Sequence, residues 1–210
     1  MFIKICGIKS LEEIEIVERY ADATGVVVEC NSKRCIGLER AREIIEVSSI
    51  PVFLVSTLDK LRDWIRVVDV TNAKYVQIHS EVDVNVVESL KDLGLFVMKA
   101  FRVPKQCDDP KMEAENLEKV IKKFNSDLIL LDTGRGSGKI HDHRISRILA
   151  KKFRVVLAGG LNPENVFKIV KFVKPYGVDV SSGVERDGKK DDELISRFVK
   201  EVKKFDKLCR

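Results

Sequence analysis

The sequence lacks the features that mark membrane, secreted and disordered proteins. Its longest apolar runs, such as residues 25–28 and 128–131, are far shorter than the roughly 20 residues that a transmembrane helix needs. Residues 1–6 have neither the long apolar segment nor the small-residue cleavage site of a signal peptide, and they indicate a buried strand. Because 44% of the residues are hydrophobic, the bulk of the chain is expected to fold around a core.

Cysteine is scarce and irregularly spaced. Five cysteines, an odd number scattered over 210 residues, argue against a disulfide scaffold and for reduced thiols in the cytoplasm. Cys30 and Cys35 have no second pair, and the neighbours His141, Asp142 and His143 seldom converge on one ion, so no metal site is expected. The net charge of +5 is mild, and residues 200–210 alternate basic and apolar positions as an amphipathic helix does. We therefore expect neither a nucleic-acid nor a membrane partner.

Short apolar runs alternate with amphipathic stretches along the whole chain. Eight strands are predicted, at residues 2–6, 24–29, 51–56, 75–79, 95–100, 128–132, 154–158 and 177–181. Eight helices are predicted, at residues 10–20, 38–47, 58–68, 84–93, 112–124, 143–152, 163–173 and 191–205. Ser10 and Glu13 form a candidate capping box, and Asn162-Pro163 is a start signal for the seventh helix.

This alternation predicts an α/β fold, a single small (β/α)8 barrel over residues 1–210. Nearly continuous apolar strands are typical of a parallel sheet that is buried on both faces. The alternative is a doubly wound open sheet. Such a sheet more often has fewer strands and a glycine-rich phosphate loop after its first strand, where this chain has only Gly7.

Polar residues and glycines follow several of the predicted strands. Active sites of such barrels lie at the C-terminal ends of the strands, and the loops after the last two strands frequently bind phosphate. Here those loops carry Gly159-Gly160 and Ser181-Ser182-Gly183, and glycine lets backbone N–H groups approach an anion. A third glycine cluster, at residues 134–139, is a candidate lid or further phosphate contact. The alternative is that these glycines only make tight turns.

Cys6 ends the first predicted strand and Asp132 ends the sixth. A thiol and a carboxyl that face each other across the barrel mouth have the arrangement that an acid–base pair needs. The alternatives are a buried structural thiol and a carboxylate that caps a helix or joins a salt bridge.

Seven motifs in this order resemble those of the phosphoribosylanthranilate isomerase family. They are KICGI at 4–8, SKR at 32–34, VQIH at 76–79, LDT at 131–133, GSGK at 136–139, AGGLNPENV at 158–166 and VDVSSGVE at 178–185. The likeness covers the whole chain. It implies a cofactor-free barrel that catalyses an Amadori rearrangement of phosphoribosylanthranilate in tryptophan biosynthesis.

The resemblance also implies roles for particular residues. Cys6 would be the general base and Asp132 the general acid, and Arg34 would hold the anthranilate carboxylate. The substrate-binding residues would be Arg34, His79, Gly138, Gly159, Gly160, Asp179, Ser181, Ser182 and Gly183. The family usually has aromatic residues on both sides of Asp142, where this chain has His141 and His143.

Two alternatives stay open on the sequence. One is another phosphate-binding barrel enzyme, such as an epimerase, an aldolase or indole-glycerol-phosphate synthase. An aldolase would need a Schiff-base lysine, for which Lys99 is the candidate. The other is a non-catalytic barrel that binds a phosphorylated ligand. Either a monomer or a homodimer is compatible with the sequence.

Overall fold

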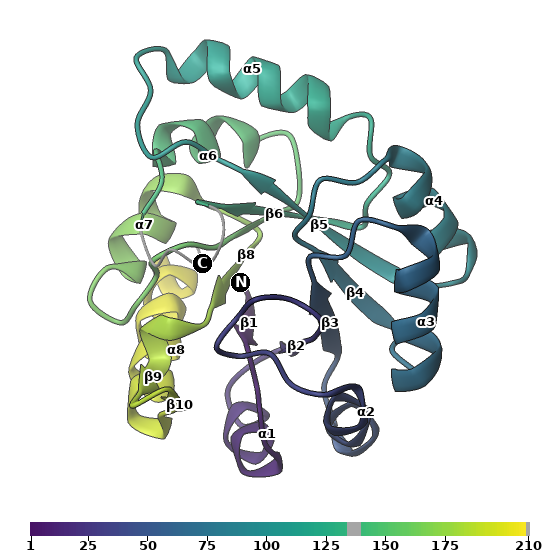
Figure 1. The fold of residues 1–210 in the computed structure, drawn as a ribbon. Coiled ribbons are helices and arrows are strands. Elements are labelled where there is room, and N and C mark those ends of the chain that lie inside the picture. Colours follow the sequence, from purple (N-terminus) through teal and green to yellow (C-terminus); the bar gives the residue numbers. More distant parts are fainter. Residues whose placement is uncertain (134–139, 209–210) are drawn as a thin grey trace.

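Eight parallel strands close into a barrel in chain order, with β8 paired to β1 (Figure 1). The structure, a computed structural model, describes residues 1–133 and 140–208. The barrel strands are β1 (Phe2–Cys6), β2 (Ala23–Val27), β3 (Val52–Ser56), β4 (Tyr75–Ile78), β5 (Phe96–Arg102), β6 (Leu128–Asp132), β7 (Val155–Leu157) and β8 (Gly177–Val180). The predicted (β/α)8 barrel is thereby confirmed, and the open sheet is excluded.

A helix follows each barrel strand and covers the outside of the barrel (Figure 1). The helices are α1 (Leu11–Val17), α2 (Leu38–Val47), α3 (Leu61–Thr71), α4 (Val84–Asp92), α5 (Pro110–Ile121), α6 (His143–Leu149), α7 (Val166–Val173) and α8 (Asp192–Leu208). Among the described residues, no helix has the length and apolar character needed to cross a membrane.

The predicted start of the seventh helix is wrong, and the predicted capping box of the first helix forms only in part. Helix α7 begins at Val166, and Asn162 instead closes a turn in which its Oδ1 accepts the backbone N–H groups of Glu164 and Asn165, each at 3.0 Å. Ser10 does cap α1, since its Oγ accepts the N–H of Glu13 at 3.3 Å. Glu13 does not return that contact, because its carboxylate accepts the backbone N–H groups of Lys9 and Lys190 instead.

The apolar core has two layers. The larger layer packs the outward side chains of the strands against the helices, and the smaller one fills the barrel interior with residues such as Val27, Phe53 and Leu130. Side chains alternate between these layers along each strand. On β1 this alternation directs Lys4 and Cys6 to the interior, where both are buried.

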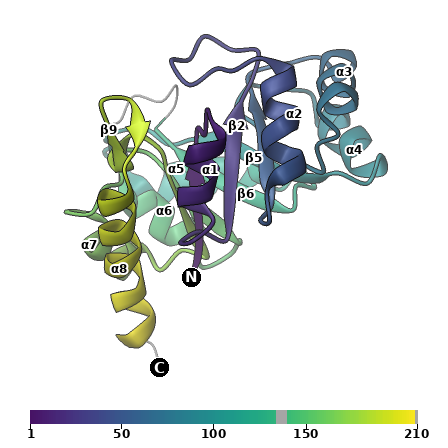
Figure 2. The same cartoon turned by 90° about the horizontal axis from the view of Figure 1, so that it is seen from below.

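A short hairpin follows β8. A 3-10 turn (Ser182–Val184) leads into β9 (Glu185–Arg186), which pairs antiparallel with β10 (Lys189–Lys190) before α8 begins. Figure 2 shows β9 and the loop between β2 and α2 at the end of the molecule opposite the N-terminus. This end carries the C-terminal ends of the strands, where the candidate residues are expected.

Candidate active site

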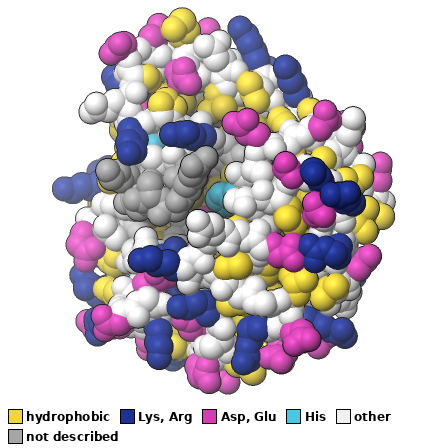
Figure 3. Space-filling model, viewed as in Figure 1, with side chains coloured by type: hydrophobic (Ala, Val, Ile, Leu, Met, Phe, Trp, Pro, Cys, Tyr) yellow, Lys and Arg dark blue, Asp and Glu magenta, His cyan; other side chains and the backbone are white. Residues whose placement is uncertain are grey.

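The strand ends bring most of the predicted site residues to one end of the barrel. Cys6 and Asp132 are the last residues of β1 and β6, and His79 and Ser181 follow β4 and β8 directly. Figure 3 shows this face, with Lys and Arg side chains above and below its centre, Asp and Glu side chains among them, and a histidine exposed near the centre. Gly138 lies outside the described residues.

Cys6 is almost fully buried, at 7% exposure, and shares its surroundings with Lys4. Gly25 on β2 is the cross-strand partner of Cys6. A Cβ atom at Gly25 would lie 3.1 Å from the Cys6 Sγ and 3.2 Å from the Lys4 Nζ. The missing side chain of Gly25 therefore leaves the space in which thiol and ammonium meet. Burial raises the pKa of the Cys6 thiol, while the charge of Lys4 acts to lower it.

Lys4 also forms an ion pair with Asp179 inside the barrel. Its Nζ donates to the Asp179 Oδ1 at 3.1 Å, and the two side chains are 0% and 7% exposed. Burial opposes the charge on Lys4, but the carboxylate of Asp179 and the nearby Cys6 together raise the pKa of its ammonium. Burial raises the pKa of Asp179, and Lys4 counteracts that rise. Lys4 is therefore held positively charged below the thiol.

His79 joins the same polar group from the far wall of the barrel. The Gln77 Nε2 lies 2.6 Å from the His79 Nε2, and the Gln77 side chain acts to lower the pKa of Asp179. Burial, with the charges of Lys4 and Lys99, lowers the pKa of His79 to about 4. A neutral imidazole can accept a hydrogen bond from the Gln77 amide at its Nε2.

Asp132 ends β6, which is separated from β1 by β7 and β8. Its side chain is 8% exposed, and its Oδ1 accepts the backbone N–H of Thr133 at 2.8 Å. Its own backbone carbonyl accepts the N–H of Val103 at 2.8 Å, which continues the sheet past β5. The strand therefore fixes where this carboxyl enters the mouth.

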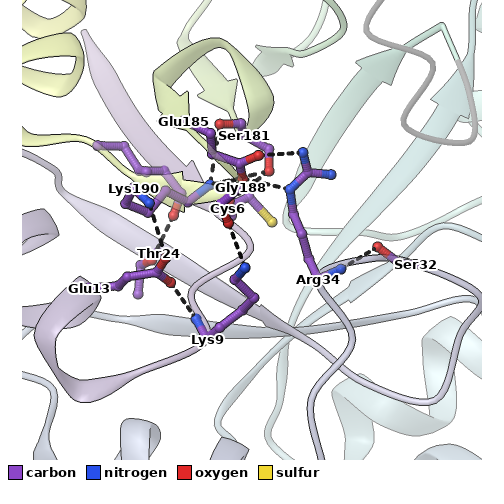
Figure 4. Close-up of polar contacts among 11 residues, drawn as sticks. Cys6, Lys9, Glu13, Thr24, Ser32, Arg34, Ser181, Glu185, Gly188 and Lys190 are labelled. Atoms are coloured by element: carbon purple, nitrogen blue, oxygen red, sulfur yellow. Dashed lines mark hydrogen bonds and ion pairs between the residues drawn. The ribbon is translucent and has the colours of Figure 1, made fainter.

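Arg34 lies in the loop between β2 and α2 and forms a bidentate ion pair with Glu185 at the start of β9 (Figure 4). The Arg34 Nε and Nη2 donate to the two carboxylate oxygens, each at 2.7 Å. Lys190 donates to the same carboxylate at 2.7 Å and to the Ser181 carbonyl at 3.2 Å. The Ser181 Oγ in turn donates to the Cys6 carbonyl at 2.8 Å.

The loops after β7 and β8 pack directly on each other. Gly159 and Gly160 have φ values of +91° and +66°, which favour glycine. A Cβ atom on Gly183 would lie 1.9 Å from the Leu161 carbonyl oxygen, so only glycine permits this approach of two backbones. Ser182, on the same loop, is exposed. The predicted phosphate-binding residues of these two loops are therefore neighbours.

His141 and His143 lie beside the mouth, before and at the start of α6. Their rings meet edge to face, with centroids 4.8 Å apart, and the His141 Nε2 lies 2.6 Å from the Ser146 Oγ. Burial and the neighbouring His143 lower the pKa of His141 to about 3. Within residues 1–133 and 140–208, no three His, Cys, Asp or Glu side chains are grouped so as to hold a metal ion.

Sequence reasoning missed Lys4, Glu185 and Lys190. A signal for Lys4 was available, because a charged residue two positions before Cys6 in a strand shares its face. Glu185 belongs to the motif at 178–185, but nothing local connects it to Arg34, which lies 151 residues away in sequence. Lys190 had no sequence signal.

Comparison with known proteins gives matches over nearly the whole chain. The family model for "N-(5'phosphoribosyl)anthranilate (PRA) isomerase" matches residues 3–201. The N-(5'-phosphoribosyl)anthranilate isomerase of Pyrococcus abyssi is 58% identical over 97% of this chain and 98% of that protein.

Solved structures of phosphoribosylanthranilate isomerases are also similar to this chain over nearly its whole length. The isomerase from Pyrococcus furiosus has a TM-score of 0.92 and 54% identity, covering 97% of this chain and 99% of that chain. An isomerase solved with reduced 1-(o-carboxyphenylamino)-1-deoxyribulose 5-phosphate has a TM-score of 0.81 and 34% identity, covering 97% of this chain and 99% of that chain.

Proposed function

The chain belongs to the phosphoribosylanthranilate isomerase family of tryptophan biosynthesis, and from that premise we propose that Cys6 and Asp132 are its acid–base pair. The reaction is the Amadori rearrangement of N-(5'-phosphoribosyl)anthranilate to 1-(2-carboxyphenylamino)-1-deoxyribulose 5-phosphate. The observation that carries the proposal is the thiol of Cys6, which shares a buried space with the ammonium of Lys4 at the end of β1.

Asp132 starts the reaction as the acid. It gives a proton to the ring oxygen, the C1'–O bond breaks, and the nitrogen lone pair forms the C1'=N double bond of a protonated Schiff base. Cys6, as thiolate, then takes the proton from C2', and the electrons of that bond move to make an enolamine. The enolamine then becomes the ketone: the Cys6 thiol returns its proton to C1', and the C2' hydroxyl gives its proton to the Asp132 carboxylate, which restores both groups.

A thiolate at neutral pH needs nearby positive charge. Lys4 supplies it from below and Lys190 from the hairpin, and both act to lower the pKa of the buried thiol. Asp179 contributes through Lys4, because it keeps the ammonium charged and fixed in place. General acid–base catalysis contributes roughly 10²–10⁴-fold for each positioned group.

The two ends of the substrate are anionic and take different parts of the mouth. The phosphate binds at the loops of Gly159, Gly160 and Ser181–Gly183, where glycine allows backbone N–H groups to approach an anion. The anthranilate carboxylate binds Arg34, whose planar fork suits a carboxylate. His79 follows β4, which lies between β2 and β7 in the order of the barrel strands. A relative binds a reduced form of the carboxyphenylamino product, which carries both anionic groups.

The proposed base requires a reducing compartment, so we propose that the enzyme acts in the cytoplasm. Cys6, Cys30, Cys35 and Cys107 are all free thiols. We propose that the enzyme is a monomer or a homodimer; a relative from Thermotoga maritima is described as dimeric.

The test follows the fluorescence of phosphoribosylanthranilate as it is consumed by the parent and by three variants. Cys6→Ser and Asp132→Asn should each lower kcat by about 10²–10⁴-fold while KM changes little, because both groups act in the transition state. Cys35→Ala is the control. It removes an exposed thiol from the loop between β2 and α2 and should keep the parent activity. A kcat within about tenfold of the parent in either active-site variant would remove that residue from the proposed pair.

A further inference from the structure

Arg34 is held in one orientation by the carboxylate of Glu185, a residue to which sequence reasoning assigned no role. Its Nε–H and one Nη2–H point to Glu185, in two hydrogen bonds of 2.7 Å. The stem of Arg34 crosses Gly7, where a Cβ atom would lie 2.4 Å from the Arg34 Cδ. Contacts on both the stem and one edge therefore fix the guanidinium beside Gly7, the residue that follows Cys6.

Glu185 is itself fixed by the hairpin on which it lies. Lys190, its cross-strand partner, donates to the Glu185 Oε1 and has a fully buried side chain. The Lys190 backbone N–H donates to Glu13 of α1 at 3.0 Å, and Lys9 Nζ donates to the Gly188 carbonyl in the turn (Figure 4). The charges of Arg34 and Lys190, acting against burial, lower the pKa of Glu185 to about 2, so it is an anion at all working pH values.

We infer that Glu185 is a positioning residue, which turns the free edge of Arg34 toward the carboxylate of the ligand. This inference rests on the proposed function, since it takes the anthranilate carboxylate as the ligand of Arg34. A guanidinium has five N–H groups in a fixed fork. With its Nε side occupied by Glu185, the edge formed by Nη1 and Nη2 remains for a second carboxylate. Arg34, Glu185 and Lys190 together carry a net charge of +1, so the cluster still attracts an anion.

Glu185 could affect carboxylate binding by orienting Arg34 or only through its negative charge. These two explanations predict opposite changes in carboxylate affinity for Glu185→Gln. If only charge mattered, removing an anion would raise the net charge of the cluster to +2 and strengthen carboxylate binding. If Glu185 orients Arg34, the variant loses the geometry of a bidentate grip, and carboxylate binding weakens. The sign of the change thus separates the two explanations.

The experiment measures inhibition constants for two probes. One is reduced 1-(o-carboxyphenylamino)-1-deoxyribulose 5-phosphate, and the other is the same compound without the carboxylate. We define the selectivity ratio as the inhibition constant of the probe without the carboxylate divided by that of the probe with it. A high ratio means that the site strongly prefers the carboxylate. Glu185→Gln should lower this ratio by about tenfold or more, as expected for loss of a charge-assisted hydrogen bond, and should raise KM more than it lowers kcat.

Two further variants make the result specific to Arg34. In an Arg34→Ala background, Glu185→Gln should change the ratio no further, because a residue that acts only through Arg34 has nothing left to position. Glu118 on α5 is the matched control. It also bridges two cations, Lys122 and Lys152, and its side chain is 14% exposed, but it lies on the outer surface. Glu118→Gln should leave the ratio at the parent value.

An unchanged or increased ratio in folded Glu185→Gln would overturn the positioning role. If that variant does not fold, Glu185→Asp keeps the charge beside Lys190 but shortens the reach to Arg34, and an unchanged ratio there would overturn it as well. Failure of the proposed function looks different, because a parent protein that does not consume phosphoribosylanthranilate or does not select the carboxylate would remove the premise itself.

Discussion

Replacing Lys4 with methionine removes the ammonium beside the Cys6 thiol and keeps an unbranched side chain in the barrel interior. The Cys6 Sγ and the Lys4 Nζ lie 3.1 Å and 3.2 Å from one point, the Cβ position of Gly25, so they are at most about 6 Å apart. With an effective dielectric constant of about 20, a thiolate and an ammonium at that distance attract each other by about 3 kcal/mol. Losing that attraction disfavours the thiolate relative to the thiol, so Lys4→Met should raise the pKa of Cys6.

The assay is the rate at which iodoacetamide alkylates Cys6 as a function of pH, followed by mass spectrometry of the peptide that contains it. Only the thiolate reacts, so the midpoint of the rate profile reports the pKa of the thiol. Cys35 is an exposed thiol on the same chain and serves as the reference in every sample. The Cys6 midpoint should move to higher pH in Lys4→Met, while Cys35 is alkylated to the same extent in the parent and the variant.

Stability has to be separated from this effect. Lys4→Met leaves the Asp179 carboxylate buried without its partner, which costs about 3–5 kcal/mol of folding free energy. The double variant Lys4→Met/Asp179→Asn removes that charge and should recover most of the lost Tm. Its Cys6 midpoint should still lie above the parent value, because Lys4 is the stronger of the two influences. An unchanged Cys6 midpoint in folded Lys4→Met protein would refute the proposed role of Lys4.

Three other perturbations address the rest of the mouth. Arg34→Ala should raise KM by about tenfold to a hundredfold with kcat little changed, and unchanged kinetics would leave Arg34 outside the carboxylate site. Gly183→Ala should weaken competitive inhibition by inorganic phosphate, because its Cβ would lie 1.9 Å from the Leu161 carbonyl oxygen, whereas Gly37→Ala, with open space around it, should not. Folding lowers the pKa of His141 from 6.5 to about 3. Below about pH 6.5 the unfolded chain therefore binds a proton at this residue and the folded chain does not, so the free energy of unfolding falls as the pH drops. That loss is about 2 kcal/mol at pH 5, and denaturant unfolding should show a shallower loss for His141→Phe; equal losses would contradict the shift.

The architecture was predictable because the signal for it is local. Each strand is a short apolar run and each helix an amphipathic stretch, and the alternation of the two defines the barrel. The prediction was wrong where one local signal is compatible with two structures. Asn162-Pro163 is a start signal for a helix, yet the same Asn162 side chain closes a turn and α7 begins at Val166.

The candidate site was only partly predictable. Cys6 and Asp132 could be proposed because strand ends of a barrel meet at one mouth. The grip of Glu185 on Arg34 joins residues 151 positions apart, and it depends on how a hairpin after β8 folds over the loop after β2. No periodicity or motif spacing encodes that contact. Lys4 was the avoidable omission, since strand alternation alone directs it to the side of Cys6.

The central claim is that the thiolate of Cys6 is the base. The most direct test compares, in the parent enzyme, the rising limb of kcat/KM against pH with the alkylation profile of Cys6. The limb of kcat/KM reports ionisation of the free enzyme, so both curves should share one midpoint. In Lys4→Met the two midpoints should move upward together. Midpoints that differ by more than about one unit, or a kinetic limb that stays in place while the thiol shifts, would assign the proton transfer to another group.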